Sequence, residues 1–257
     1  MRLGISYNVF EGEELLACAV SQVRNNIDFI SVVYQTESYF GNKSNDSLLS
    51  TLISLKEEKL IDELVEHKND PCLTPRENEV NARNAGLQAS IKNGCTHHIS
   101  ADVDEIYENI EYVKSKMDGY DSSVVYLENY YKCSNYQITP SQNHQTTFIH
   151  SVDFYYSMEV DYPYNIDMTR RLVDVKNCIV FNKDDFLIHH MSYVRRNIRS
   201  KIYNSGNWVI SDKEKFVKEY ELYKLGDKLK IPPDFNNRRT KFVHNNFLKG
   251  ITWAQHQ

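Results

Sequence analysis

The feature that most constrains the fold is a regular alternation of strand-like and helix-like segments over about the first hundred residues. Short β-branched and aromatic runs predict buried strands, and segments with apolar residues at helical spacing predict the helices between them. The predicted strands are residues 2–7, 28–35, 61–67 and 96–100, and the predicted helices are residues 11–25, 47–59 and 76–93. Strands connected in this way pair in parallel, because each helix carries the chain back across the sheet.

Residues at the ends of these segments support the same assignment. Carboxylates stand at the start of the first helix, where the helix dipole favours negative charge, and Gly94 follows the third helix as a C-terminal cap. Residues 70–75 form a proline-containing break before the third helix. We therefore expect an α/β fold with a mostly parallel, Rossmann-like sheet flanked by helices.

The pattern changes after Gly119. Short Tyr- and Val-rich runs joined by polar loops predict strands at residues 123–131, 146–152, 153–160 and 178–181. The apolar run at residues 186–188 predicts an edge strand that ends at His189 and His190. From Ser192 onward the sequence is interpreted as helical.

Composition excludes several other classes of protein. The chain has 257 residues, of which 41% are hydrophobic and 25% charged, which is typical of a globular protein that needs no metal or disulfide to hold its core. The apolar run at residues 15–20 is far shorter than the roughly 20 residues of a bilayer span. We expect neither a signal peptide nor disulfides, because the start lacks an apolar stretch and the five cysteines are widely spaced. The expected compartment is the cytoplasm.

Charge is divided unevenly along the chain. From Tyr193 to the end there are 14 Lys and Arg against 6 Asp and Glu, a net charge of +8, whereas the rest carries 16 cations and 29 anions, a net charge of −13. A basic segment on an acidic body suggests a polyanionic partner. The alternative is a solvated helical face that balances the acidic body.

Two carboxylates separated by one residue follow the fourth predicted strand. Ligands of open α/β sheets bind at the carboxyl ends of the strands, where Asp102 and Asp104 stand. In extended backbone both side chains would face the same side, and their oxygens are suited to Mn²⁺ or Mg²⁺. Such a cation could bridge to a diphosphate and neutralise charge as it leaves. A solvated turn is the alternative for so short a motif.

The residues around this motif resemble a known family. The helix contains NARNAG (residues 81–86), and a glycine turn and an apolar strand then lead into the acidic motif in GCTHHISADVDE (residues 94–105). This pattern is similar to the GT-A nucleotide-sugar glycosyltransferases, especially the family-two type. The start, ISYN (residues 5–8) followed by Glu11, Glu13 and Glu14, resembles the first strand and the Asn-Glu-Glu turn of that family. The resemblance covers about residues 1–120.

The resemblance implies a metal-dependent enzyme that moves a sugar from a nucleoside diphosphate sugar, most simply a UDP-sugar, to an acceptor hydroxyl. Residues 1–190 would form the GT-A catalytic domain, with residues 1–120 as its nucleotide-sugar half and residues 121–190 as its acceptor half. Residues 191–257 would form a basic helical extension.

The resemblance also implies roles for single residues. Asp104 would be the principal metal ligand, and Asp102 would contact ribose or metal. The other nucleotide-sugar contacts in this half would be Tyr7, Asn8, Gln35, Glu37, Arg83 and Asn84. The family often has an Asp at the end of its second strand, where this chain has Gln35-Thr36-Glu37. For Arg83, an ion pair on a helix face is the alternative.

The second half offers further candidates. Many GT-A enzymes supply a late histidine to the metal or diphosphate, and His190 is favoured slightly over His189, with a structural histidine as the alternative. Arg195 and Arg199 would share a helix face and could clamp a diphosphate or an anionic acceptor. An inverting enzyme needs a base, for which Asp167 is the first candidate, whereas a retaining enzyme needs none.

The acceptor stays open between two classes. The family as a whole favours a saccharide or lipid-linked glycan. The basic segment keeps open a hydroxymethylated base in DNA, as in phage glycosyltransferases, which would have to flip the base and would bind in a salt-dependent way. A nucleotidyltransferase would be expected to carry a basic, Gly-rich loop where residues 8–14 are acidic. A non-catalytic nucleic-acid-binding protein would not explain the acidic motif.

Overall fold

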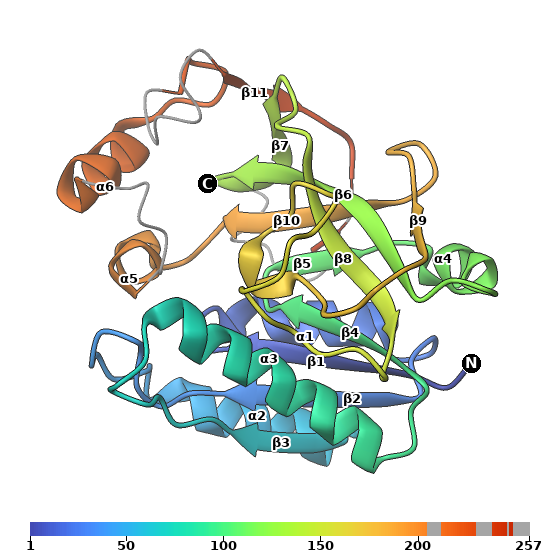
Figure 1. The fold of residues 1–257 in the computed structure, drawn as a ribbon. Helices are drawn as coiled ribbons and strands as arrows, with labels where there is room; N and C mark the ends of the chain where they lie inside the picture. Colours follow the sequence, from blue (N-terminus) through green and yellow to red (C-terminus); the bar gives the residue numbers. More distant parts are fainter. Residues whose placement is uncertain (205–211, 230–237, 246, 249–257) are drawn as a thin grey trace.

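The computed structural model describes residues 1–204, 212–229, 238–245, 247 and 248, and these form one mixed sheet with helices around it (Figure 1). The strand order is β11-β7-β6-β8-β4-β1-β2-β3, with β9 and β10 beside β6 and β5 beside β10. The strands are β1 (Leu3–Val9), β2 (Phe29–Tyr34), β3 (Glu63–Glu66), β4 (His97–Asp102), β5 (Glu105–Tyr107), β6 (Ser122–Tyr131), β7 (Cys133–Thr139), β8 (His144–Ser151), β9 (Cys178–Val180), β10 (Leu187–Tyr193) and β11 (Arg239–Phe242). The helices are α1 (Glu13–Val23), α2 (Ser47–Glu57), α3 (Pro75–Lys92), α4 (Ile110–Lys116), α5 (Ile198–Asn204) and α6 (Lys213–Leu222), with a short 3₁₀ helix η1 (Met168–Arg170).

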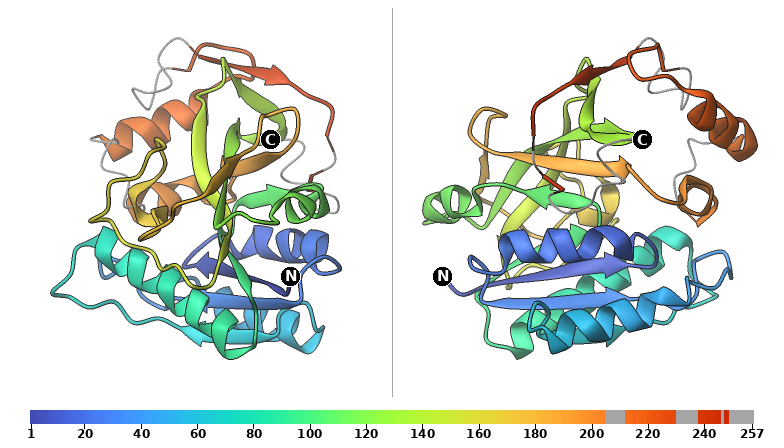
Figure 2. Two further views of the ribbon diagram at one scale, coloured as in Figure 1. Left: turned by 45° about the vertical axis from the view of Figure 1, so that its right-hand side comes forward. Right: turned by 180° about the vertical axis from the view of Figure 1, so that it is seen from behind.

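The N-terminal half has the expected parallel arrangement. Strands β3, β2, β1 and β4 pair in parallel, and Ile5 lies opposite Ile30 on one side and Ile99 on the other. Helix α3 covers one face of this sheet, and α1 and α2 cover the other (Figures 1 and 2). Because both faces are covered, these strands are almost wholly apolar and buried. The expected α/β class is confirmed, and the first seven predicted elements match the structure to within two residues at each end.

The position of α3 follows from its two ends and one glycine. Thr74 and Glu77 form a reciprocal capping box, and Pro75 occupies the first helical position. A Cβ on Gly86 would lie 2.2 Å from the Oγ of Ser6, so only glycine allows α3 to approach β1 this closely. Arg83 lies about one turn before Gly86 in α3, so the same close contact brings Arg83 to the end of β4.

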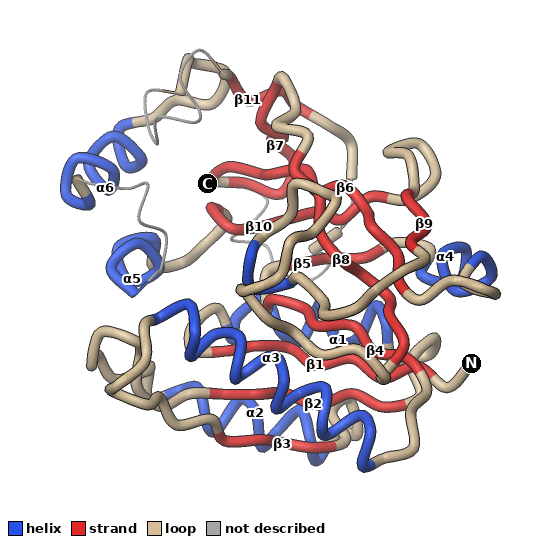
Figure 3. Tube along the Cα trace, viewed as in Figure 1, coloured by secondary structure: helices blue, strands red, loops and turns tan. Residues whose placement is uncertain are grey.

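The second half adds strands that bring late residues back to the end of β4. Strand β10 lies between β5, to which it is antiparallel, and β6, to which it is parallel (Figure 3). The expectation of an edge strand was therefore wrong, because β5 covers the side of β10 that would have been exposed. The register places His190 opposite both Glu105 and Asn129.

Residues 153–160 do not form the expected strand. The backbone polar groups of Tyr156 bind a helix side chain instead of a neighbouring strand: Asn84 donates to the Tyr156 carbonyl oxygen at 3.0 Å and accepts from its N–H at 2.9 Å. Strand β7 was not expected, although the other runs at residues 123–131, 146–152 and 178–181 correspond to β6, β8 and β9.

The C-terminal segment is only partly helical in the described residues. Helices α5 and α6 form as expected, but β11 adds a strand along β7. Residues 205–211, 230–237, 246 and 249–257 of the predicted basic extension lie outside the described residues. The predicted domain boundary at residue 190 lies inside strand β10, and the division into domains stays a prediction. In the described ranges, none of the helices has the length and apolar character to cross a bilayer.

Candidate active site

The carboxyl ends of β1 and β4 form the centre of the site. Asn8, next to last in β1, lies opposite Asp102, which ends β4. The Asn8 amide donates to the Ser100 hydroxyl at 3.3 Å, while its own Oδ1 is buried without a hydrogen-bond partner. Because β4 ends at Asp102, Asp104 lies in the following turn and not in extended backbone. The two carboxylates therefore contact different basic side chains.

Asp102 is held by two buried arginines. Its Oδ1 lies 3.2 Å from Arg83 Nη2 and its Oδ2 lies 2.9 Å from Arg170 Nη2. Burial raises the pKa of Asp102, but the two guanidinium groups outweigh that effect and hold the pKa below its usual range. The side chain still keeps 36% of its surface exposed. The result is an oriented, ionised carboxylate that can accept hydrogen bonds from a ligand.

Arg83 forms the ion pair on the helix that was the alternative for it, and its predicted contact with a nucleotide sugar stays a prediction. It pairs along α3 with Glu79 at 2.7 Å, so the ion pair on the helix is present. It also donates to Ser100 at 3.1 Å and contacts Asp102, so it belongs to the strand-end cluster. Its side chain is 1% exposed. Arg83 is therefore placed to orient the carboxylate of Asp102.

Arg170 and Glu105 complete this half of the site, although neither was predicted as a site residue. Arg170 Nη2 lies 2.5 Å from Glu105 Oε1, and Tyr107 donates to the other oxygen of Glu105 at 2.6 Å. Both charged side chains are almost completely buried. Glu105 was visible in the sequence as the acid after the Asp-x-Asp motif, whereas Arg170 was visible only as one of two adjacent arginines before β9.

Asp104 is the most enclosed carboxylate of the motif, with 1% of its surface exposed. Its Oδ2 is in close contact with Arg195 Nη2 and lies 3.4 Å from Lys201 Nζ. Burial raises the pKa of Asp104, but the charges of Lys201 and Arg195 outweigh burial and hold the pKa well below its usual range. Its Oδ1 faces His190 Nε2 at 3.5 Å.

The donor set at Asp104 and His190 fits a divalent cation. The facing Oδ1 and Nε2 atoms are an oxygen and an imidazole nitrogen, and the other ring nitrogen of His190 lies 2.8 Å from Asn129 Oδ1. Both oxygens of Asp102 contact guanidinium groups instead, and its predicted place among the metal ligands stays a prediction. In the part of the chain that the structure describes, no three Asp, Glu, His or Cys residues gather into a metal-binding group. A cation here would take the rest of its shell from water and phosphate.

Arg195 and Arg199 do not share a helix face, because α5 begins only at Ile198. Arg195 turns inward to Asp104, and its Nη1 occupies the space that a Cβ on Gly12 would fill. Arg199 instead pairs with Glu214 at 2.6 Å on an exposed surface. Of the two predicted clamp residues, only Arg195 is therefore in the cluster.

Asp167 lies next to the cluster, where its Oδ1 binds neighbouring groups while 44% of the side chain stays exposed. It caps η1 by accepting from the Thr169 N–H at 2.9 Å, and it pairs with Arg76 at 3.0 Å. Burial raises the pKa of Asp167, while Arg83 and the Thr169 N–H outweigh it and lower the pKa. A carboxylate with a lowered pKa is a weak base. Its predicted role as a base stays untested.

Four further predicted contacts lie outside the cluster. Tyr7 is fully buried in the core, where its hydroxyl donates to the Ala19 carbonyl at 3.4 Å. Gln35 is buried and donates to Asn69 at 2.5 Å, and Glu37 is exposed in the loop after β2. Asn84 anchors the segment at Tyr156, as described above. Their predicted contacts with a nucleotide sugar stay predictions.

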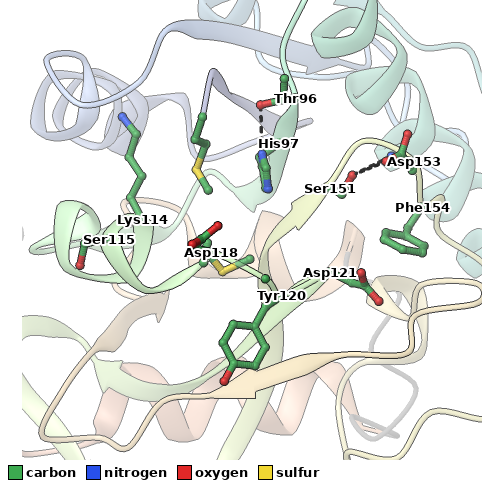
Figure 4. Close-up of a pocket in the computed structure, with 13 residues that line it drawn as sticks. Thr96, His97, Lys114, Ser115, Asp118, Tyr120, Asp121, Ser151, Asp153 and Phe154 are labelled. Atoms are coloured by element: carbon green, nitrogen blue, oxygen red, sulfur yellow. Dashed lines mark hydrogen bonds between the residues drawn. The ribbon is translucent and has the colours of Figure 1, made fainter.

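A separate cavity of about 690 Å³ lies at the opposite end of β4 (Figure 4). Thr96 and His97 line it where β4 begins, together with Lys114, Asp118 and Asp153. No residue that was predicted for the site lines this cavity.

Comparison with known proteins gives fold-level likeness only. No family model and no curated protein sequence matches the chain. A crystal structure of TarS from S. aureus, residues 1–349, matches 80% of this chain and 66% of that chain, with 12% identity and a TM-score of 0.45. A mannose-1-phosphate geranyltransferase from Thermus thermophilus matches 54% of this chain and 45% of that chain, with 10% identity and a TM-score of 0.32. The functional proposal therefore rests on the geometry of the site.

Proposed function

We propose that this protein is a glycosyltransferase that moves a sugar from a nucleoside diphosphate sugar, most simply a UDP-sugar, to an acceptor hydroxyl. The observation that carries the proposal is the pair of ionised carboxylates at the carboxyl end of β4 and in the turn after it, with the basic side chains of Arg83, Arg170, Arg195 and Lys201 around them. Such an edge is where open α/β sheets bind nucleotides. The cluster offers a carboxylate, Asp102, that can accept from hydroxyl groups, and at Asp104 and His190 it offers ligands for a cation that a diphosphate could bind.

Each half of the cluster has its own role in this proposal. Asp102, oriented by Arg83 and Arg170, accepts hydrogen bonds from the donor's hydroxyl groups. Asp104 and His190 hold a divalent cation, Mn²⁺ or Mg²⁺. The cation would supply neutralising charge to the departing diphosphate. Arg195 and Lys201 keep Asp104 ionised and fixed, and they add positive charge on the same side.

The acceptor is proposed to be a saccharide or a lipid-linked glycan. The DNA alternative rested on the basic segment, and several of its cations are occupied within the chain. Arg195 and Lys201 contact Asp104, and Arg199 contacts Glu214. A DNA acceptor would instead give binding to hydroxymethylated duplex DNA that weakens steeply with salt.

The test is donor hydrolysis and transfer with a panel of UDP-, GDP- and ADP-sugars. Wild-type protein should cleave one of them, and Asp104→Asn should lower kcat by at least about a hundredfold. Asp118→Asn, an exposed carboxylate at the distant cavity, is the matched control and should keep full activity. Thermal melting confirms that each variant is folded. Absence of cleavage and of nucleotide binding across the whole panel would refute the proposal.

A further inference from the structure

His190 is held between two groups that both accept hydrogen bonds. Its Nδ1 lies 2.8 Å from Asn129 Oδ1, and its Nε2 lies 3.5 Å from Asp104 Oδ1. The contact with Asn129 follows from the sheet itself, because β10 and β6 place these two residues opposite each other. Asn129 is 8% exposed, so water does not readily replace this contact.

The orientation of the Asn129 amide is set by a third residue. Its Nδ2 donates to Gln142 Oε1 at 2.6 Å, which leaves its Oδ1 as the atom that faces His190. A carbonyl oxygen can only accept, so Nδ1 of His190 must carry the proton of this hydrogen bond. In a neutral imidazole, Nε2 is then an unprotonated nitrogen with its lone pair directed toward Asp104.

The consequence is a pair of lone-pair donors that face each other across 3.5 Å. Nε2 of His190 and Oδ1 of Asp104 cannot hydrogen-bond to each other in this state, and a cation between them satisfies both. Metal-binding histidines characteristically donate their second ring N–H to such an acceptor, which orients the ring and fixes its tautomer.

The ring nitrogens of the neighbouring His189 have different partners. Its Nε2 lies 3.4 Å from the carboxylate of Glu108, and its Nδ1 lies 3.0 Å from the Tyr130 hydroxyl, which is able to donate. Its ring stacks on Phe247 at 3.6 Å. Nothing in this set requires a proton on Nδ1, so His189 serves as an internal reference for His190.

We propose that Asn129 is a positioning residue of the cation site: it holds His190 in the tautomer with the proton on Nδ1, so that Nε2 and Asp104 together face the cation. Gln142 supports it by fixing the amide. This inference rests on the proposed function, which assigns the cation to Asp104 and His190. It adds two residues that had no role in the sequence-based prediction.

The tautomer can be measured without any turnover. Long-range ¹H–¹⁵N NMR of uniformly ¹⁵N-labelled protein at neutral pH distinguishes a protonated Nδ1 from a protonated Nε2. Wild-type His190 should show the Nδ1–H form, and Asn129→Leu, which removes the acceptor, should lose it. Asn129→Asp keeps an acceptor and should retain it. Gln142→Ala is a milder variant that frees the amide to rotate and should give a mixture.

Cation affinity provides the second readout. Binding of Mn²⁺, alone and with UDP, is followed by electron paramagnetic resonance. Asn129→Leu should weaken binding by about 10- to 100-fold, and Asn129→Asp should restore it. Tyr130→Phe, which removes the partner of His189 on the same strand, is the matched control and should bind Mn²⁺ as the wild type does.

The results separate this inference from the function on which it rests. A wild-type His190 protonated on Nε2, or an Asn129→Leu variant with unchanged tautomer and unchanged Mn²⁺ binding, would overturn the inference. If the tautomer and Mn²⁺ binding behave as expected but no nucleotide sugar is cleaved, the role of Asn129 stands and the proposed function fails. If Asn129→Leu does not fold, Gln142→Ala and Asn129→Asp decide the question by the same two measurements.

Discussion

Two buried histidines should make the stability of this protein sensitive to mild acid. His150 at the end of β8 and His98 in β4 are both fully buried, with ring centroids 5.5 Å apart. His150 Nε2 lies 2.7 Å from the Tyr156 hydroxyl, and His98 lies between the hydroxyl groups of Ser6 and Ser90. The bonded partners around the two rings are thus hydroxyls and backbone, none of them an anion, so the folded protein has little to stabilise an imidazolium there.

The magnitude follows from the shift at His150. Burial lowers the pKa of His150 from 6.5 to about 4, and the nearby His97 adds to the lowering. Above about pH 6.5 the ring is neutral in the folded and unfolded chain, so it has no effect. As the pH falls from 6.5 toward 4, only the unfolded chain takes up the proton, and the folded state loses stability. At pH 4.5 this single group should cost about 2 to 3 kcal/mol relative to pH 7.5.

The assay compares the free energy of unfolding from urea titrations at pH 7.5 and pH 4.5. Wild-type protein should lose about 2 to 3 kcal/mol more between these values than His150→Gln, whose amide can still reach the Tyr156 hydroxyl but does not titrate. His244→Gln, at an exposed histidine, is the control and should respond to pH as the wild type does. Carboxylates elsewhere titrate equally in all three proteins. An equal loss in wild type and His150→Gln would refute the reasoning.

Three further variants test the site. Gly12→Ala should lower kcat/KM at least about tenfold, because the new Cβ would lie 1.7 Å from Arg195 Nη1. Gly94→Ala is the control: it introduces the same left-handed backbone strain, but its Cβ would lie in open space, so it should only lower the melting temperature. Arg199→Ala should change stability little and leave the donor KM unchanged, since its ion pair is exposed; a raised KM would restore its predicted role as a clamp. Asp167→Asn should reduce kcat less than about tenfold, and a loss of a hundredfold or more would identify it as the base after all.

The first half of the fold could be predicted because its information is local. Each parallel strand is a short apolar run buried on both faces, and each helix between them shows helical spacing or a cap. The same locality made Asp102 and Asp104 visible, since a strand that ends in charged residues places them at the ligand-binding edge. The prediction then failed where it assumed extended backbone through Asp104, because the strand ends at Asp102 and the two carboxylates diverge to different cations.

The partners of these carboxylates could not be predicted because they come from distant parts of the chain. Arg170 reaches the site as the last residue of η1, and Asn129 reaches it only because β10 is inserted beside β6. Neither has a local pattern that marks it. The strand predicted at residues 153–160 was wrong for a related reason. Its tyrosines are typical of a strand, but the backbone of Tyr156 forms its hydrogen bonds with the side chain of Asn84, which is distant in the sequence.

The charge division along the chain shows why net charge alone does not identify a partner. A net charge of +8 after Tyr193 suggests a surface for polyanions, but the structure brings the beginning of that segment onto the acidic turn at the end of β1. Ser200 donates to Glu11, the backbone of Arg196 donates to Glu14, and Lys201 contacts Asp104. The charges of Arg195 and Lys201 therefore help to build the site itself through their contacts with Asp104. A segment whose charges are used in this way has fewer cations to offer a long polyanion, which needs many of them in a row.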